Sequence, residues 1–126
     1  MELYRIIQNY FKHVDSRGSL VGLINIGSWG EVNIINSDAG TIRGGHYHKA
    51  TEECFFILSG KILVKFRMPV KDNLDLIEEV VFNSGDVFIV HANVEHTFEV
   101  LEDSQWINLL DKPLDKEAPD FYRYKS

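Results

Sequence analysis

The sequence is poor in cysteine and proline, with one cysteine and three prolines among its 126 residues. Cys54 cannot form a disulfide within the chain, and this sparing use of cysteine fits a reducing compartment, so we expect a cytoplasmic protein. Cys54 also opens the apolar run Cys54–Leu58, where a free cysteine usually acts as a small buried hydrophobe. It is therefore a poor candidate for a catalytic nucleophile.

Long apolar runs and an excess of basic residues are also missing. Cys54–Leu58 and Val80–Phe82 are far shorter than the roughly 20 apolar residues of a membrane-spanning helix. The start, Met1–Arg5, has no basic stretch before an apolar block, as a signal peptide would. Thirteen Lys and Arg stand against nineteen Asp and Glu, giving a net charge of −6. We therefore expect neither a membrane nor nucleic acid among the partners.

The residues that are present are sufficient for a folded domain. Hydrophobic residues make up 44% of the chain and aromatic residues 12%, which is enough for an apolar core. No repeat, low-complexity block or linker interrupts the sequence. We therefore expect residues 1–126 to form a single domain.

Turn signals recur at short intervals, among them Gly44-Gly45 and Ser59-Gly60. Between them lie short runs rich in Ile, Val, Phe and Leu, and Lys61–Met68 alternates clearly, so the pattern predicts an all-β sandwich or barrel. Leu74–Val81 also fits a short helix, and the tail Lys112–Ser126 is expected to be an irregular segment over the surface. The predicted strands are Tyr4–Val14, Leu20–Ile26, Val32–Asn36, Thr41–His48, Cys54–Leu58, Lys61–Met68, Leu76–Phe82, Val87–Val90, His96–Leu101 and Gln105–Leu110.

Histidines and a glutamate form the pattern with the most chemical content. His46 and His48 are alternate residues of a predicted strand, so both imidazoles point into the same space. With Glu53 and the later His96, they would form a set of three imidazoles and one carboxylate, which suits a divalent metal such as Zn, Fe, Ni, Mn or Cu. Other interpretations stay open. The paired histidines could transfer protons or be buried polar groups, and Glu52 competes with Glu53 as a ligand.

Two segments carry a resemblance to a known family. His46–Glu53, closed by Gly60, resembles the first cupin motif, a His-x-His pair followed by Glu and Gly. Gly85–His96 resembles the second motif, with His91 in place of its proline and Asn93 in place of its turn glycine. The resemblance implies an all-β fold, the cupin (RmlC-like) antiparallel β-barrel or jelly roll, in agreement with the predicted strands.

Further segments narrow the resemblance within the cupins. Asp15–Leu20 and Arg43–Lys49 are similar to segments of the small cupins that modify nucleotide-linked sugars, the dTDP-4-keto-6-deoxyhexose 3,4-ketoisomerases and 3,5-epimerases. Arg43–Arg67, followed by Ala118–Tyr122, resembles the cupin domain of bifunctional capsule-precursor enzymes, which epimerise a UDP-linked keto sugar. The resemblance implies an isomerase or epimerase of surface-polysaccharide or deoxysugar biosynthesis, acting by proton abstraction next to a ketone on a dTDP- or UDP-linked sugar.

The resemblance also implies roles for single residues. His46 matches the catalytic base of the isomerases and epimerases, and His48 matches a histidine that takes part in the isomerases. Arg17 and Arg43 are implied to bind the pyrophosphate, with added charge from Lys49.

The capsule-type cupins imply a metal instead, and no organic cofactor. The implied ligands of a divalent Zn, Ni, Fe or Mn ion are His46, His48, Glu53 and His96. These roles compete, because a histidine that binds a metal is not a free base.

The sequence leaves two other functions open and also suggests an oligomeric state. A non-enzymatic cupin module that binds a metal or a sugar is the main alternative, since this fold hosts many activities. A metal-dependent dioxygenase shares the ligand set but leaves Asp15–Leu20 unexplained.

The resembling sugar-modifying cupins are homodimers that often exchange N-terminal strands. We therefore expect a homodimer in which the apolar run Leu3–Phe11 pairs with a partner's sheet edge.

Overall fold

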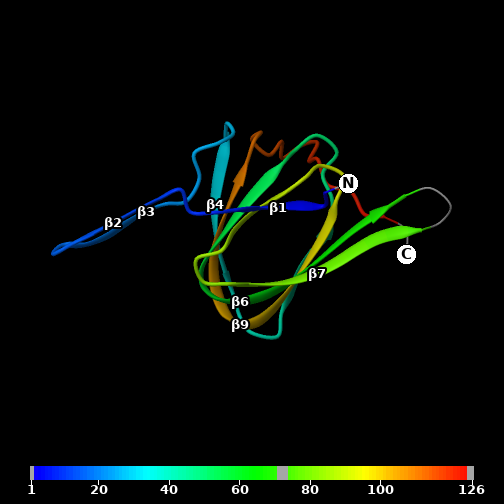
Figure 1. Ribbon diagram of the computed structural model, residues 1–126. Coiled ribbons are helices and arrows are strands. Elements are labelled where there is room, and N and C mark those ends of the chain that lie inside the picture. The colour runs from blue at the N-terminus through cyan, green and yellow to red at the C-terminus, as the bar shows by residue number, and fades with distance from the viewer. Residues whose placement is uncertain (1, 71–73, 125–126) are drawn as a thin grey trace.

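The computed structural model describes residues 2–70 and 74–124, and the regular structure in these residues is entirely β (Figure 1). Among the described residues there is no helix long and apolar enough to cross a membrane. The strands are β1 (Tyr4–Ile7), β2 (Phe11–Asp15), β3 (Gly18–Gly22), β4 (Glu31–Ser37), β5 (Ile42–His46), β6 (Glu53–Pro69), β7 (Asp75–Asn83), β8 (Val87–Val90) and β9 (Glu95–Leu110).

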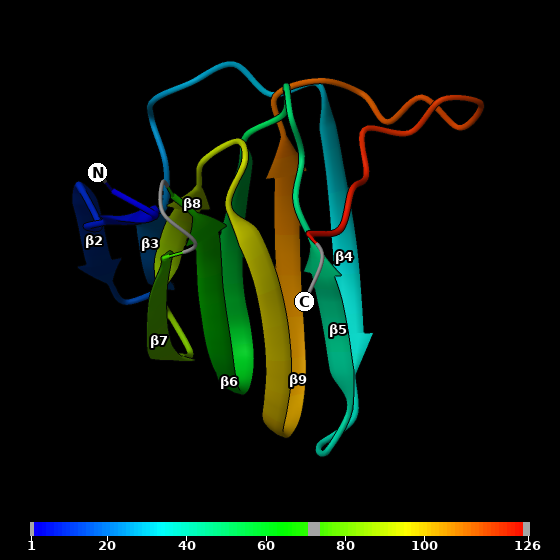
Figure 2. The same cartoon turned by 90° about the vertical axis from the view of Figure 1, so that its right-hand side faces the viewer.

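The long strands β6 and β9 form the centre of a seven-stranded antiparallel sheet (Figure 2). Beyond β6 lie β8 and β7, with β1 paired to β8, and beyond β9 lie β4 and β5. The pairing of β6 with β9 shifts register between Ile57 and Ile62, where the sheet bends. The sheet can therefore curl around an apolar interior, and the predicted antiparallel all-β fold is confirmed.

Alternate residues of the long strands fill the interior. Phe55, Phe66, Phe98 and Trp106 belong to one core cluster and are almost completely buried. The neighbouring residue Phe56 faces the opposite side of the sheet, because successive side chains of a strand alternate between its faces.

A second, outer cluster lies on that opposite side. It joins Cys54 and Phe56 to Val87 and Ile89, and Trp29 and other residues of the segment 23–29 pack against it. The apolar pattern of Cys54–Leu58 therefore reflects a strand buried on both faces.

Several predicted strands differ from those observed. Cys54–Leu58 and Lys61–Met68 belong to the single strand β6, and the two segments 96–101 and 105–110 belong to β9. Tyr4–Val14 is divided between β1 and β2, and Leu20–Ile26 continues only to Gly22 as a strand. The helix considered for Leu74–Val81 is wrong, since that segment forms β7. The sequence Lys71-Asp72-Asn73 also carries a turn signal, and it lies outside the described residues.

The N-terminal region forms two separate features. Within the run Leu3–Phe11, which is expected to pair with a partner's sheet edge, Tyr4–Ile7 pairs with β8 of its own chain. The following hairpin of β2 and β3 pairs only with itself among the described residues and projects from the barrel (Figure 1).

Candidate active site

Three strand segments bring the predicted cluster together at one end of the barrel. His46 ends β5, Glu53 begins β6, and His96 lies on β9 directly opposite His46 in the strand register. His48 follows His46 by two residues. The pairing of β5 with β9 shifts register between Gly44 and His46. A Cβ on Gly44 would lie 2.6 Å from the carbonyl oxygen of His96, and φ there is +82°, so the close approach requires glycine.

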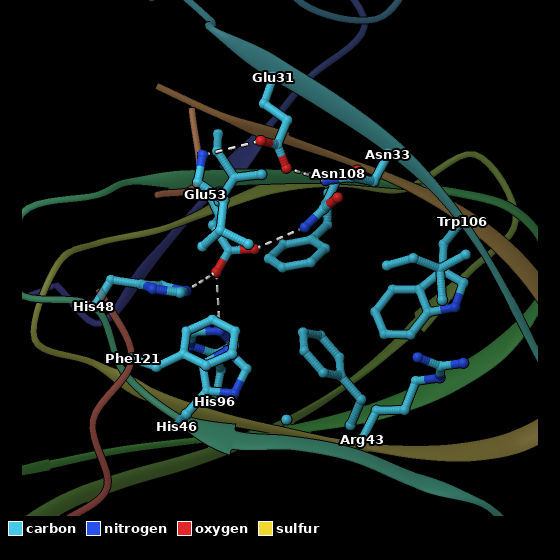
Figure 3. A pocket seen from close by; sticks show the side chains of 16 residues that line it. Glu31, Asn33, Arg43, His46, His48, Glu53, His96, Trp106, Asn108 and Phe121 are labelled. Carbon is cyan, nitrogen blue, oxygen red and sulfur yellow. Dashed lines mark hydrogen bonds and ion pairs between the residues drawn. The ribbon is translucent and has the colours of Figure 1, made fainter. Parts of the chain in front are cut away.

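The four side chains converge on a single point (Figure 3). One ligand atom from each of His46, His48, Glu53 and His96 lies within 4.8 Å of the others. His48, Glu53 and His96 are buried, whereas His46 is half-buried. The ring centroid of His46 lies 5.0 Å from that of His48 and 4.9 Å from that of His96.

Glu53 is the acceptor at the centre of this cluster. Nε2 of His48 donates a hydrogen bond to its Oε1, and Nδ2 of Asn108 donates to its Oε2 over 2.9 Å. Nε2 of His96 lies 3.2 Å from Oε1, close enough for charge attraction, yet its geometry makes no hydrogen bond. A buried ring nitrogen thus points at the carboxylate without a hydrogen-bond partner of its own.

This arrangement fits a divalent cation. It offers three imidazole nitrogens and one carboxylate within reach of one another, a donor set suited to Zn, Ni, Fe or Mn. Ligation would also give the orphaned Nε2 of His96 a partner, where burial otherwise leaves a polar atom unsatisfied.

The protonation states differ across the cluster. Burial raises the pKa of Glu53, but the hydrogen bond from His48 and the attraction of His96 outweigh it and leave the pKa below its usual value. Burial lowers the pKa of His48, but the bond to Glu53 reverses this and leaves it raised. Burial, with repulsion from His96 and His48, lowers the pKa of His46 to about 4. His46 is therefore an unprotonated imidazole at neutral pH, beside a His48–Glu53 ion pair.

A cavity of about 180 Å³ extends from these residues into the barrel (Figure 3). Phe98, Trp106, Arg43, Asn108 and Phe121 help to line it. The lining thus combines apolar side chains with polar and charged groups of the kind that orient a small-molecule ligand. No tyrosine is found among the described residues that line it.

The predicted phosphate-binding residues are separated in space. Arg43 lines the cavity, and its guanidinium donates to the carbonyl of Asn36 over 3.3 Å. Lys49 lies outside it, with Nζ 4.1 Å above the ring of Tyr122. Arg17 lies far from the cavity lining, in the turn between β2 and β3, because its hairpin projects from the barrel. It pairs there with Asp15 over 2.7 Å.

The competition between Glu52 and Glu53 is resolved by strand parity. Glu53 points into the cluster, whereas Glu52 lies outside and its Oε1 is 3.2 Å from Nδ1 of His91.

Asn93, which stands where the cupin motif has its turn glycine, adopts a positive φ of 70°, a conformation that asparagine tolerates better than most residues.

Three residues at the site were not predicted from their own pattern. Asn108 is one of several polar residues on β9, and only the sheet register, which pairs it with Phe55, brings its side chain within reach of Glu53. Asp120 and Phe121 lie in the irregular tail, where no periodicity indicates which side chains turn toward the barrel. The resemblance of Ala118–Tyr122 to capsule-type cupins is the one signal that could have drawn attention to them.

Comparisons with known proteins agree with this picture. A family model described as "Polysaccharide biosynthesis C-terminal domain" matches residues 13–122, which is most of the chain. Over 55 residues the chain is 34% identical to the UDP-2-acetamido-2,6-beta-L-arabino-hexul-4-ose reductase of Pseudomonas aeruginosa. That match covers 44% of this chain and 15% of the reductase.

Two solved structures extend the likeness over nearly the whole chain. The capsular polysaccharide assembling protein CapF of Staphylococcus aureus is 28% identical, with a TM-score of 0.69 over 92% of this chain and 32% of CapF. A 3,4-ketoisomerase of Helicobacter canadensis has a TM-score of 0.79 at 17% identity, covering 96% of this chain and 90% of that one. At 17% identity, the likeness to the 3,4-ketoisomerase shows a shared fold only. The chain spans about a third of CapF and a smaller share of the reductase.

Proposed function

Because this chain belongs to the polysaccharide biosynthesis C-terminal domain family, we propose that it is an isomerase or epimerase acting on a nucleotide-linked 4-keto-6-deoxy sugar. The observation that carries the proposal is the unprotonated His46 beside the buried His48–Glu53 pair, at the end of a sugar-sized cavity. The structural relatives include a 3,4-ketoisomerase and a capsular polysaccharide assembling protein, and both support a role in sugar metabolism.

The proposed chemistry begins with a proton next to a ketone. A carbonyl at sugar C4 acidifies the C3–H, and His46 accepts that proton because its imidazole is neutral at the working pH. The electron pair moves onto the carbonyl oxygen and forms an enediolate. The positive charge of His48, maintained by Glu53, lies nearby and stabilises that oxygen. Returning the proton to C3 from the other face gives epimerisation, whereas moving the carbonyl to C3 gives ketoisomerisation.

A metal would alter this division of roles. His46, His48, Glu53 and His96 would hold the cation, which when bound supplies positive charge for an enolate oxygen. With His46 engaged as a ligand, the proton acceptor would have to lie elsewhere. Elemental analysis of protein purified without chelator distinguishes the two forms. Near-stoichiometric metal, lost in His96→Ala and Glu53→Ala, would identify the metal form and would remove His46 from the role of base. A metal-free protein that still catalyses exchange would return His46 to the role of base.

The substrate is proposed to bind with its sugar inside the cavity and its nucleotide outside. The cavity is smaller than the roughly 300–1,000 Å³ of sites that enclose drug-sized ligands, so it holds a hexose and leaves the nucleotide at its mouth. Arg43 at the wall then pairs with the pyrophosphate. Arg43→Ala should weaken nucleotide-sugar binding by about 1.5–3 kcal/mol, the range for hydrogen bonds to charged groups. Unchanged dTDP and UDP affinity would remove the phosphate role of Arg43.

Proton exchange in D2O tests the function directly. The protein is incubated with dTDP- and UDP-linked 4-keto-6-deoxy sugars, and the C3–H and C5–H signals are followed by NMR. Exchange at C3 alone, exchange at both carbons, or carbonyl migration identifies the reaction. His46→Gln should reduce the exchange by at least about 100-fold, the lower range for a general base. Binding of these sugars without any exchange would favour the non-enzymatic module instead.

A further inference from the structure

The segment Pro119–Tyr124, which we call the C-terminal strap, lies beside His46 and His48. Its backbone pairs with β5's continuation, since Tyr47 and Tyr122 exchange two N–H···O bonds of 2.9 and 3.0 Å. The ring of Tyr124 stacks on that of Tyr47 at 3.9 Å, and its hydroxyl donates to the carbonyl of Asn93 over 2.6 Å. The strap is thus anchored on both sides of the site.

Asp120 makes the densest set of strap contacts. Its carboxylate accepts the backbone N–H groups of Lys49 and Ala50, each over 2.9 Å, and the hydroxyl of the buried Thr51 over 2.9 Å. These donors belong to the turn that leads from His48 to Glu53. The Asp120 side chain therefore fixes the turn between two members of the cluster.

The backbone of Asp120 acts on His48 itself. Nδ1 of His48 lies 2.5 Å from the Asp120 carbonyl oxygen, which can only accept, so Nδ1 carries a proton and donates it. The other nitrogen, Nε2, is thereby directed at Glu53. A histidine fixed in this way has its ring orientation and the role of each nitrogen set by the strap.

Phe121 occupies the cavity side of the strap. Its ring stacks on His46, with centroids 4.5 Å apart and an angle of 22° between the planes, and it is part of the cavity lining (Figure 3). About half of its surface, 49%, remains exposed although the ring is large and apolar. One ring face thus covers the proposed base, while exposed surface is left beside the space where a sugar would lie.

We infer that the C-terminal strap is a functional part of the site. Asp120 is a positioning residue for His48, and Phe121 is a residue that determines sugar specificity. The inference rests on the proposed function for its substrate, but the His48 contact can be tested without turnover. Strap contacts span more than 70 residues of sequence, from His48 to Asp120, so the barrel alone does not complete the site.

The positioning role is tested with Asp120→Ala, using Asp103→Ala as the matched control. Asp103 likewise accepts a distant backbone N–H, that of Ala39, whereas the donors to Asp120 lie in the turn between His48 and Glu53. In 15N-labelled wild-type protein, the Nδ1–H of His48 should exchange slowly with solvent. Asp120→Ala should speed this exchange about tenfold or more, as expected when several hydrogen bonds that hold the strap are lost. It should also lower kcat for C3 exchange about 10- to 100-fold with little change in KM.

The possible outcomes distinguish a failure of the strap assignment from a failure of the proposed function. If the wild-type protein exchanges no sugar proton but Asp120→Ala still frees the His48 Nδ1–H, the strap assignment holds and the proposed function fails. If Asp120→Ala leaves both that proton and kcat at the wild-type values, the positioning role is wrong. An equal effect of Asp103→Ala would mean that any loop cap acts in this way and would also overturn the assignment.

The specificity role is tested with Phe121→Ala. Loss of an aromatic contact with the sugar should raise KM for the nucleotide sugar about 3- to 10-fold, while Kd for free dTDP and UDP stays unchanged. Ile77→Ala is the control, because Ile77 is a similarly exposed apolar residue on β7, away from the cavity lining. An equal weakening of free nucleotide, or no change in KM, would contradict a sugar contact by Phe121.

Discussion

Glu53 and Cys54 are neighbours on β6, yet burial has different consequences for their charges. Both are buried, and burial disfavours the ionised form of each. Glu53 faces the histidines, whose protons and charge outweigh this effect and keep the carboxylate ionised. Cys54 faces the outer cluster, where no such partner compensates among the described residues, and burial raises its pKa to about 12. One step along a strand thus separates a charged group from an inert one.

The first prediction concerns the thiol of Cys54. With a pKa of about 12, it is almost entirely protonated at pH 8, and the thiolate is the reactive form. We expect native protein to react with a thiol reagent such as DTNB at least about 100-fold more slowly than protein unfolded in guanidinium. Time courses of absorbance under both conditions provide the measurement. Equally fast labelling would show that the outer cluster opens readily.

A second residue-scale prediction concerns the pH dependence of stability in metal-free protein. The pKa of His46 falls from 6.5 to about 4 on folding, so the unfolded chain binds a proton that the folded chain refuses between these values. Stability therefore decreases as pH falls through this window. Comparing Tm at pH 7 and pH 4.5 in wild type and His46→Gln isolates this contribution. The variant should lose less Tm on acidification, and an identical loss would contradict the assignment.

At the same scale, the sequence allowed the cluster to be predicted but not all of its surroundings. The His46-x-His48 parity and the cupin motifs indicated residues that do converge. Arg17 and Lys49 were chosen by resemblance, and their distance from the cavity depends on a projecting hairpin and on the strap, neither of which has a local pattern. Phe121 was missed for the same reason.

At the scale of elements, strand pattern predicted most positions but misjudged continuity. Ser59-Gly60 was interpreted as a turn between two strands, because glycine usually ends regular structure. In the structure Gly60, at a φ of +95°, bends β6 without ending it. The partner strand β9 runs alongside through the shift in register, and a single sequence does not reveal such pairing. Val87–Val90, which has no such bend, was predicted with its observed bounds.

The third prediction tests this bend. A Cβ on Gly60 would overlap Oγ of Ser104 and lie 2.5 Å from the carbonyl oxygen of Asp103, in a conformation that already disfavours side chains. Gly60→Ala should destabilise the protein by about 3 kcal/mol or more, from overpacking and the positive φ together. Gly40→Ala is the control, since Gly40 has a φ of +86° but open space around it, and should cost only about 1–2 kcal/mol. Urea denaturation measures both, and equal losses would contradict a packing role for the bend.

At the scale of the whole molecule, apolar side chains are exposed at several places, among them the projecting hairpin and β4. The projecting hairpin exposes Val14 and Leu20 at 65% and 62%, and β4 exposes Val32 and Ile34 at 63% and 60%. Val32 and Ile34 pair with Leu109 and Ile107, which pack against the outer cluster, so they continue that apolar face to the edge of the sheet. In a dimer, the hairpin of one chain could pack against the apolar sheet face of the other, and both surfaces would then be buried.

The fourth prediction is therefore a homodimer built through the hairpin. Multi-angle light scattering at micromolar concentration should give twice the 14.5 kDa of one chain. Val14→Glu combined with Leu20→Glu should shift the mass to 14.5 kDa, because two charges would be buried without partners. Ile77→Glu, at an exposed position on the separate strand β7, should remain dimeric. If the hairpin carries Arg17 to the partner's cavity, Arg17→Ala should weaken dTDP or UDP binding without changing the mass. A wild-type mass of one chain would remove this route and leave Arg17 paired only with Asp15.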